Sequence, residues 1–250
     1  MAGHQPDRYT QVVEFRTKLL STLKAIQSVL DVPGVMVIGS EVPNLLQPEA
    51  ASTLVVSQDV DIGVPVKRIE EVKTALQEVV GLEPSEEEPS VWLPSLPDII
   101  EVNFVGMDPD VDDPTGAFVI EDARLPLLVF GALSLLREGP AVAIEGLEIP
   151  LPRPAGLLLE KLLTERVAEK GVRDLLVVVG LLVVMVEADH EELVEDYLGL
   201  PAELRYAVRS NLTILSLMQQ GMDGMPDPRP HRGRIAELLI RFEALGAEAE

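Results

Sequence analysis

Cysteine is absent from the 250-residue sequence, and histidine occurs only three times. The lack of cysteine excludes disulfides, thiolate nucleophiles and zinc sites built on cysteine. The histidines, at positions 4, 190 and 231, are too scattered to suggest a histidine metal site. A chain without a disulfide framework fits a cytoplasmic location.

Long apolar runs are also lacking. The most apolar stretch, Leu175 to Val186, has 12 residues, whereas a membrane-spanning helix needs about 20. We therefore expect this stretch to form a buried helix. The first eight residues are polar and contain no apolar core of a secretory signal. These features predict a cytoplasmic protein that does not enter a membrane.

Basic residues are scarce, with 20 Lys and Arg against 42 Asp and Glu, so that the formal net charge is −22. This balance argues against a general nucleic-acid-binding protein, which needs basic side chains to replace the counterions of the phosphates. A local basic groove stays possible, because one segment collects Arg153, Lys161, Arg166, Lys170 and Arg173. Hydrophobic residues make up 47% of the chain and support a sizeable core.

Hydrophobic periodicity predicts an α+β fold: a mixed sheet flanked by helices over residues 1–150, then a helical domain over residues 151–250. In the first part we expect helices at 9–30 and 69–80, a weak helix at 41–46, and an acidic turn at 83–89. Expected strands are 35–38, 53–56, 60–66, 91–93, 99–105, 117–120, 127–130, 142–144 and 147–149. In the second part we expect helices at 155–170, 172–188, 190–197, 202–218 and 234–245, with a helix break at Gly171.

One stretch of the chain suggests chemistry. A buried strand ending in Gly39-Ser40 is followed, after an 18-residue spacer, by Asp59-Val-Asp61-Ile. Alternate residues of a strand point to opposite faces, so the two aspartates share one face. Two adjacent carboxylates repel each other unless a cation lies between them, and a hard divalent metal ion prefers such oxygens. The alternative is an ordinary strand whose solvated face happens to be acidic.

A third acid, Glu101, lies on a later predicted strand, on the same face as Asn103. Gly-Ser after a buried strand, then Asp-x-Asp, then a third acid resembles the nucleotidyltransferase superfamily, which has the DNA polymerase β-like fold. The helical half resembles the nucleotidyltransferase toxins of the AbiEii type through Lys161 and the Arg173-Asp174 pair. The sequence differs from the family pattern at two positions, where Ala168 and Val177 stand in place of an expected arginine and an expected acid. The spacer after Ser40 is also longer than is usual in the family.

The resemblance implies Mg²⁺-dependent transfer of a nucleoside monophosphate from an NTP to an acceptor. In this interpretation Asp59, Asp61 and Glu101 hold two Mg²⁺ ions that contact the attacking and leaving oxygens, and Glu101 could also accept a proton. Nucleotide binding would involve Gly39 and Ser40 at the phosphates and Lys161 as a point charge, together with the Arg173-Asp174 pair. The acceptor could be RNA, a protein hydroxyl or a small molecule, and the chain could be the effector of a toxin–antitoxin pair.

Other interpretations stay open. The chain could be a catalytically inactive relative that uses the fold for binding or assembly, with a homodimer or an antitoxin as partner. It could also modify a cationic small molecule, as antibiotic-adenylylating enzymes do, because the negative charge suits such a substrate. Gly39 could be only a turn residue, Glu101 a solvated strand acid, and Lys161 an ordinary surface lysine. Asp174 could simply stabilise the start of the apolar helix.

Overall fold

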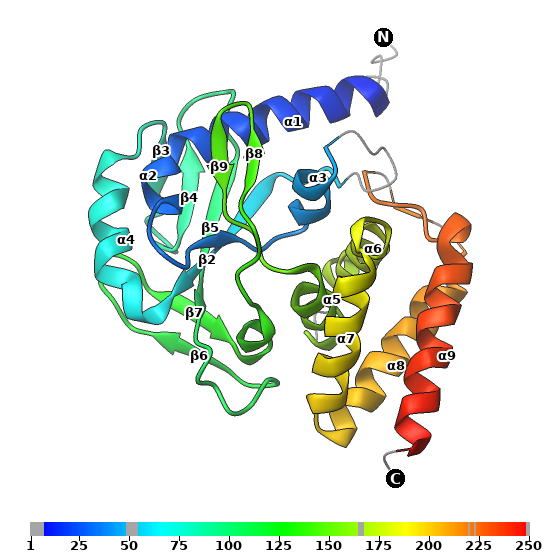
Figure 1. The fold of residues 1–250 in the computed structure, drawn as a ribbon. Helices are drawn as coiled ribbons and strands as arrows, with labels where there is room; N and C mark the ends of the chain where they lie inside the picture. The colour runs from blue at the N-terminus through cyan, green and yellow to red at the C-terminus, as the bar shows by residue number, and fades with distance from the viewer. Residues whose placement is uncertain (1–7, 49–54, 165–167, 220, 223, 249–250) are drawn as a thin grey trace.

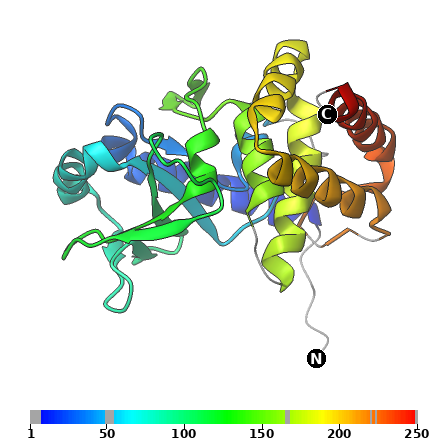
Figure 2. The ribbon, with the colours of Figure 1, turned by 90° about the horizontal axis from the view of Figure 1, so that it is seen from below.

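The computed structural model describes residues 8–48, 55–164, 168–219, 221–222 and 224–248. An α+β half built on a mixed sheet lies beside a helical half, which occupies the right-hand side of Figure 1. The view from below shows the same two halves side by side (Figure 2). The fold class predicted from the sequence is confirmed at this level: α+β with a mixed sheet.

The α+β half contains the strands and the first helices. Its helices and 3₁₀ turns are α1 (Arg8–Ala25), α2 (Gln27–Leu30), α3 (Val42–Leu46), η2 (Val66–Arg68), α4 (Ile69–Ala75), η3 (Leu76–Glu78) and η4 (Gly131–Leu135). Its strands are β1 (Met36–Val37), β2 (Asp59–Pro65), β3 (Leu82–Pro84), β4 (Val91–Pro94), β5 (Glu101–Met107), β6 (Ala117–Ile120), β7 (Leu127–Phe130), β8 (Val142–Ile144) and β9 (Leu147–Ile149).

The helical half follows the β8–β9 hairpin. Its elements are α5 (Pro154–Leu163), α6 (Ala168–Val184), α7 (Glu187–Gly199), α8 (Ala202–Leu217), η5 (Arg229–His231) and α9 (Arg232–Glu248). Helix α5 starts with a proline, whose missing N–H costs nothing in a first helical turn. Its leucines are buried on several sides, because α5 packs against η4 of the first half as well as α6, α7 and α8. Helix α5 thus joins the two halves.

The sheet is mixed. Strands β1, β2, β5, β4 and β3 follow one another in that order, while β7 pairs with β5 and carries β6 at its outer side. Strands β2 and β5 are parallel, and β1 and β4 run antiparallel to them. The parallel pair requires a crossover, which α4 and the β3–β4 hairpin provide. The central pair β2–β5 therefore has neighbours on both sides.

The two faces of β2 and β5 differ in character. Val60, Ile62 and Val64 alternate along β2 and are fully buried in the main core. The buried hydroxyl Oγ1 of Thr22 in α1 accepts a 2.9 Å hydrogen bond from the backbone N–H of Ile100, which fixes α1 on this face. The opposite face carries the polar residues of both strands near their amino ends, and a small apolar cluster (Met36, Ile38, Met107 and Leu133) near their carboxyl ends.

Three local expectations were wrong. Gly171 does not break a helix: it lies inside α6, and the preceding helix already ends at Leu163. The predicted acidic turn begins later than expected, because Glu83 and Pro84 belong to β3, which pairs with β4. The strand expected at 53–56 is not formed by Val55 and Val56, and its first two residues lie outside the described residues. Tertiary contacts override weak local preferences at Glu83–Pro84 and at Val55–Val56, whereas a single glycine such as Gly171 costs a helix only about 1 kcal/mol.

Helix α6 is apolar but short, with 17 residues. Among the described residues, none of the helices combines the length and apolarity needed to traverse a membrane.

Candidate functional site

The carboxylates predicted from the sequence lie at the amino ends of the two central parallel strands. In the β2–β5 register Asp59 is opposite Glu101, and Asp61 is opposite Asn103. All four side chains belong to the same face of the sheet and are half-buried. The structure therefore brings Asp59, Asp61 and Glu101 together on one polar face, as their alternation predicted.

Asn103 connects the two aspartates. Its Nδ2 donates to Asp59 Oδ2 at 3.0 Å and to Asp61 Oδ1 at 3.3 Å. The other carboxylate oxygen of Asp59 accepts a 2.5 Å hydrogen bond from Ser57 Oγ. The sequence had already indicated that Asn103 shares the face of Glu101, but it offered no sign that this amide would bridge the aspartates.

Glu41 is a fourth acid at this site and was not predicted. It follows Gly39-Ser40 directly, is 1% exposed, and accepts a 2.7 Å hydrogen bond from Ser40 Oγ at Oε1. Its Oε2 is buried without a hydrogen-bond partner. Burial, and secondly the negative charge of Asp61, raise the pKa of Glu41 from 4.5 to about 8.

Gly39 has a specific reason to lack a side chain. A Cβ at this position would overlap Glu41 Oε2 and lie 3.2 Å from Asp61 Oδ2. The glycine thus gives room to two carboxyl groups. Ser40, which was predicted to approach a phosphate, uses its hydroxyl to bind Glu41 in this structure.

Residues 55–57, which lead into β2, form hydrogen bonds with three other parts of the chain. The side chain of Asn44 in α3 forms paired hydrogen bonds with the backbone of Val55, at 2.7 and 2.9 Å. The N–H of Val56 donates to the carbonyl of Gly224 at 2.7 Å. Arg173 of α6 donates to Val56 O and to Ser57 Oγ, both at 3.4 Å. The predicted site residue Arg173 therefore reaches the aspartates only indirectly, through Ser57.

Lys161 and Asp174 lie in a buried charge cluster between α5 and α6. Lys161 Nζ is 3.3 Å from Asp174 Oδ1 and 3.1 Å from Glu160 Oε2. The lysine side chain is only 4% exposed, so it offers little surface to a triphosphate. The sequence associated these two residues through the family resemblance, and the structure joins them as an ion pair.

A different lysine affects the carboxylates. Burial raises the pKa of Glu101, and the charges of Asp59, Asp61 and Glu88 add to this effect, whereas the positive charge of Lys170 lowers it. Lys170 is exposed in the first turn of α6. Its position near the acidic face could not be inferred from the sequence, where it resembles any surface lysine.

The donor atoms of this face suit Mg²⁺, which prefers carboxylate oxygens. Asp59, Asp61 and Glu101 each offer such oxygens, and Glu41 adds a buried oxygen that lacks a partner. The side chains as they stand are arranged for hydrogen bonding, with the Asn103 amide donating to both aspartates. Across the part of the chain that the structure describes, no group of three or more His, Cys, Asp or Glu side chains is placed to hold a metal ion.

A scan against protein-family models finds no match to this sequence, and a search of curated proteins finds no significant match.

Proposed function

We propose that this protein is a Mg²⁺-dependent nucleotidyltransferase of the DNA polymerase β-like superfamily. The observation that carries the proposal is the register of the two parallel strands, which aligns Asp59 with Glu101 and puts Asp61 on the same face. Three carboxylates from two adjacent strands suit a metal-assisted displacement at phosphorus better than they suit an ordinary solvated face, because β2 and β5 are central strands.

In this proposal Asp59, Asp61 and Glu101 would hold Mg²⁺. The ions, when bound, would neutralise the triphosphate and the charge that develops during in-line transfer. Glu101 would also accept the proton of the attacking hydroxyl. Ser57 and Asn103 would keep the carboxylate of Asp59 oriented, since both donate hydrogen bonds to it.

The cation for the triphosphate is proposed to be Lys170 in place of Lys161. Lys170 is exposed, and its charge acts on Glu101, whereas Lys161 is engaged with two buried acids. Gly39, Ser40, Arg173 and Asp174 then contribute by shaping and supporting the site. The acceptor, and a role as the effector of a toxin–antitoxin pair, follow only from the resemblance to the AbiEii-type toxins.

The chain offers a well-matched control for testing this function. The tripeptide Asp-Val-Asp occurs twice, at 59–61 in β2 and at 110–112 in a loop where both aspartates are exposed. We would titrate each NTP with Mg²⁺ into the wild type, an Asp59→Asn/Asp61→Asn variant and an Asp110→Asn/Asp112→Asn variant by calorimetry. All three proteins would first be compared by circular dichroism.

The enzyme proposal is supported if NTP binding requires Mg²⁺, is lost in Asp59→Asn/Asp61→Asn and persists in Asp110→Asn/Asp112→Asn. The NTP that binds would then be used, with a radioactive α-phosphate, to screen RNA, protein and small-molecule acceptors. If no NTP binds to the folded wild type, the enzyme proposal is wrong.

A second candidate is a catalytically inactive relative that serves as a binding or assembly module, with a second copy or an antitoxin as partner. The observation in its favour is that Asn103 and Ser57 already satisfy the aspartates with hydrogen bonds inside the chain. The same titration separates the candidates, because an inactive module of this kind predicts no Mg²⁺-dependent heat with any NTP.

A further inference from the structure

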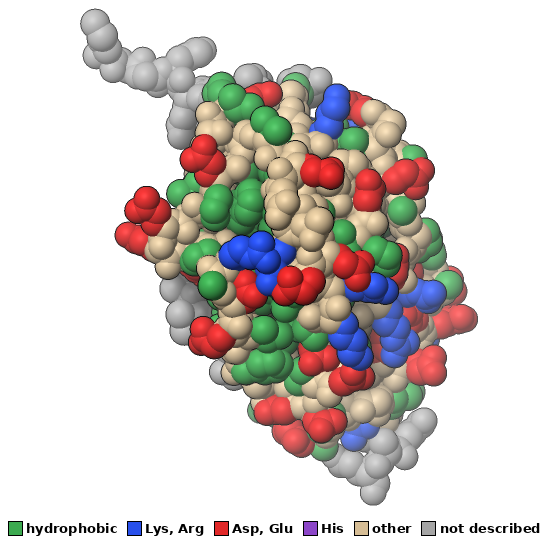
Figure 3. Space-filling model, turned by 90° about the vertical axis from the view of Figure 1, so that its left-hand side faces the viewer, with side chains coloured by type: hydrophobic (Ala, Val, Ile, Leu, Met, Phe, Trp, Pro, Cys, Tyr) green, Lys and Arg blue, Asp and Glu red, His purple; other side chains and the backbone are tan. Residues whose placement is uncertain are grey.

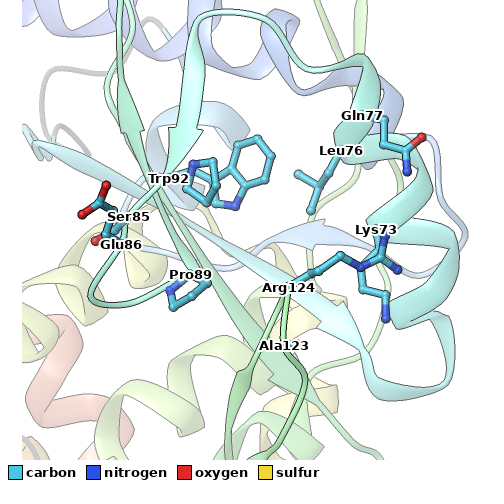
Figure 4. A pocket seen from close by; sticks show the side chains of 10 residues that line it. Lys73, Leu76, Gln77, Ser85, Glu86, Pro89, Trp92, Ala123 and Arg124 are labelled. Atoms are coloured by element: carbon cyan, nitrogen blue, oxygen red, sulfur yellow. The ribbon is translucent and has the colours of Figure 1, made fainter.

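A pocket of about 610 Å³ lies between α4–η3 and the turn that follows β3 (Figure 4). Its volume falls in the range that small-molecule sites occupy. Leu76, Pro89 and Trp92 form its apolar wall. Trp92 pairs in register with Val102, whereas Val91 pairs with Asn103. Because adjacent strand residues face opposite sides, the pocket lies on the face of the sheet opposite the carboxylates.

The apolar wall contains one unsatisfied polar group. Trp92 is 9% exposed, and its indole Nε1 is buried without a hydrogen-bond partner. Figure 4 shows the nitrogen of the indole turned toward the space between Pro89 and Leu76. An indole N–H can only donate, and a buried donor without a partner is costly. A ligand that brings an acceptor to this wall would therefore gain a hydrogen bond that the protein alone lacks.

The rim of the pocket supplies positive charge. Lys73 Nζ is 2.7 Å from Asp122 Oδ2 and also bonded to Glu70, so its charge is used within the protein. Arg124, in contrast, is 61% exposed and approaches its acid, Glu70, only to 3.8 Å. In Figure 4 the Arg124 side chain extends below Leu76, while the carboxylate of Glu86 at the other end of the pocket is turned away.

The surface around this region is mixed. Figure 3 shows the side of the molecule that carries α4, where hydrophobic side chains are exposed between acidic and basic ones. A ligand held here would meet both apolar contact and charge. Aromatic rings suit the indole, since aromatic pairs gain more than their buried area alone provides.

We propose that this pocket is a second ligand site, for a small planar aromatic molecule that carries an anionic group. The ring system would pack against Trp92 and Leu76, and the anionic group would pair with Arg124. The site is separate from the carboxylate face and does not depend on the function proposed for that face.

The protein contains a single tryptophan, so Trp92 itself reports on the pocket. The probe is 1-anilinonaphthalene-8-sulfonate, a sulfonate on a planar naphthalene ring system that absorbs tryptophan emission. We would titrate it into the full-length protein while measuring the quenching of Trp92. The neutral N-phenyl-1-naphthylamine is the matched probe without the sulfonate.

Three variants complete the test. Ala123→Phe places a ring at an exposed position that lines the pocket and should block it. Arg124→Gln removes the rim cation. Arg68→Gln is its control, because Arg68 pairs with Glu71 at 2.6 Å and does not line the pocket.

We expect saturable quenching of Trp92 by the sulfonate in the wild type and in Arg68→Gln. Affinity should fall about two- to fivefold in Arg124→Gln, the range for an exposed ion pair, and about tenfold or more in Ala123→Phe. Circular dichroism would confirm that each variant is folded. The proposal is overturned if Trp92 is not quenched, if Ala123→Phe binds as the wild type does, or if the neutral probe binds as tightly as the sulfonate.

Discussion

Substitution of Glu41 gives the most direct physical test of the site, because the effect of its buried carboxylate charge on the free energy of unfolding depends on pH. We expect Glu41→Gln to stabilise the folded protein at alkaline pH. The variant keeps the shape of the side chain and an oxygen that can accept from Ser40, but it removes the charge that burial and Asp61 make unfavourable.

The sign follows from proton binding. The pKa of Glu41 is about 8 in the folded protein against 4.5 when exposed, so between these values the folded state holds a proton that the unfolded state has lost. The free energy of unfolding of the wild type therefore falls as pH rises through this window. Each pKa unit corresponds to about 1.4 kcal/mol. Above pH 8 the buried charge of Glu41 therefore lowers the free energy of unfolding by on the order of 3–5 kcal/mol.

The assay is urea denaturation of the wild type and the variant from pH 5 to pH 9, with a chelator present so that no divalent metal binds. The difference in unfolding free energy should grow in favour of Glu41→Gln from pH 5 to about pH 8 and then level off. Glu83→Gln, at an exposed position, should show no such trend. A constant difference across the pH range, or a variant that is less stable at pH 9, would refute the reasoning.

Three further changes have defined expectations. Lys161→Met leaves two buried carboxylates without their cation and should lower the unfolding free energy by about 3–5 kcal/mol in urea denaturation. Gly39→Ala should cost about 1–3 kcal/mol in the same assay, and combining it with Glu41→Ala should recover most of that loss, because the clash is with the Glu41 carboxyl. Arg173→Ala should weaken any Mg²⁺–NTP binding in calorimetry about fivefold with little change in stability, a value typical of lost hydrogen bonds.

The sequence predicted those parts of the site that depend on local periodicity. Asp59 and Asp61 alternate with buried aliphatic residues on β2, and this pattern alone puts them on one face. Glu101 was assigned correctly to the same face of a neighbouring strand. The acidic side chains that form the site were therefore accessible to pattern analysis, apart from Glu41.

The remaining features depend on contacts between distant parts of the chain. Glu41 looks like an ordinary residue at the start of a weak helix, and only the folded chain shows that its carboxyl is buried in the space left by Gly39. The approach of Lys170 to Glu101 joins residues far apart in sequence. Gly171 lies inside α6, because a single glycine costs a helix interior only about 1 kcal/mol and does not by itself end the helix.

The hydrogen bond between Val56 and Gly224 has a consequence for synthesis of the protein on the ribosome. The residues just before β2 emerge early, but one of the groups that hold them is made 168 residues later. A nascent chain can form its central strands before the acidic face acquires its final support. Translation must pass position 224 before that support is complete, so a ribosome-bound or prematurely terminated chain would carry the aspartates without the geometry that orients them.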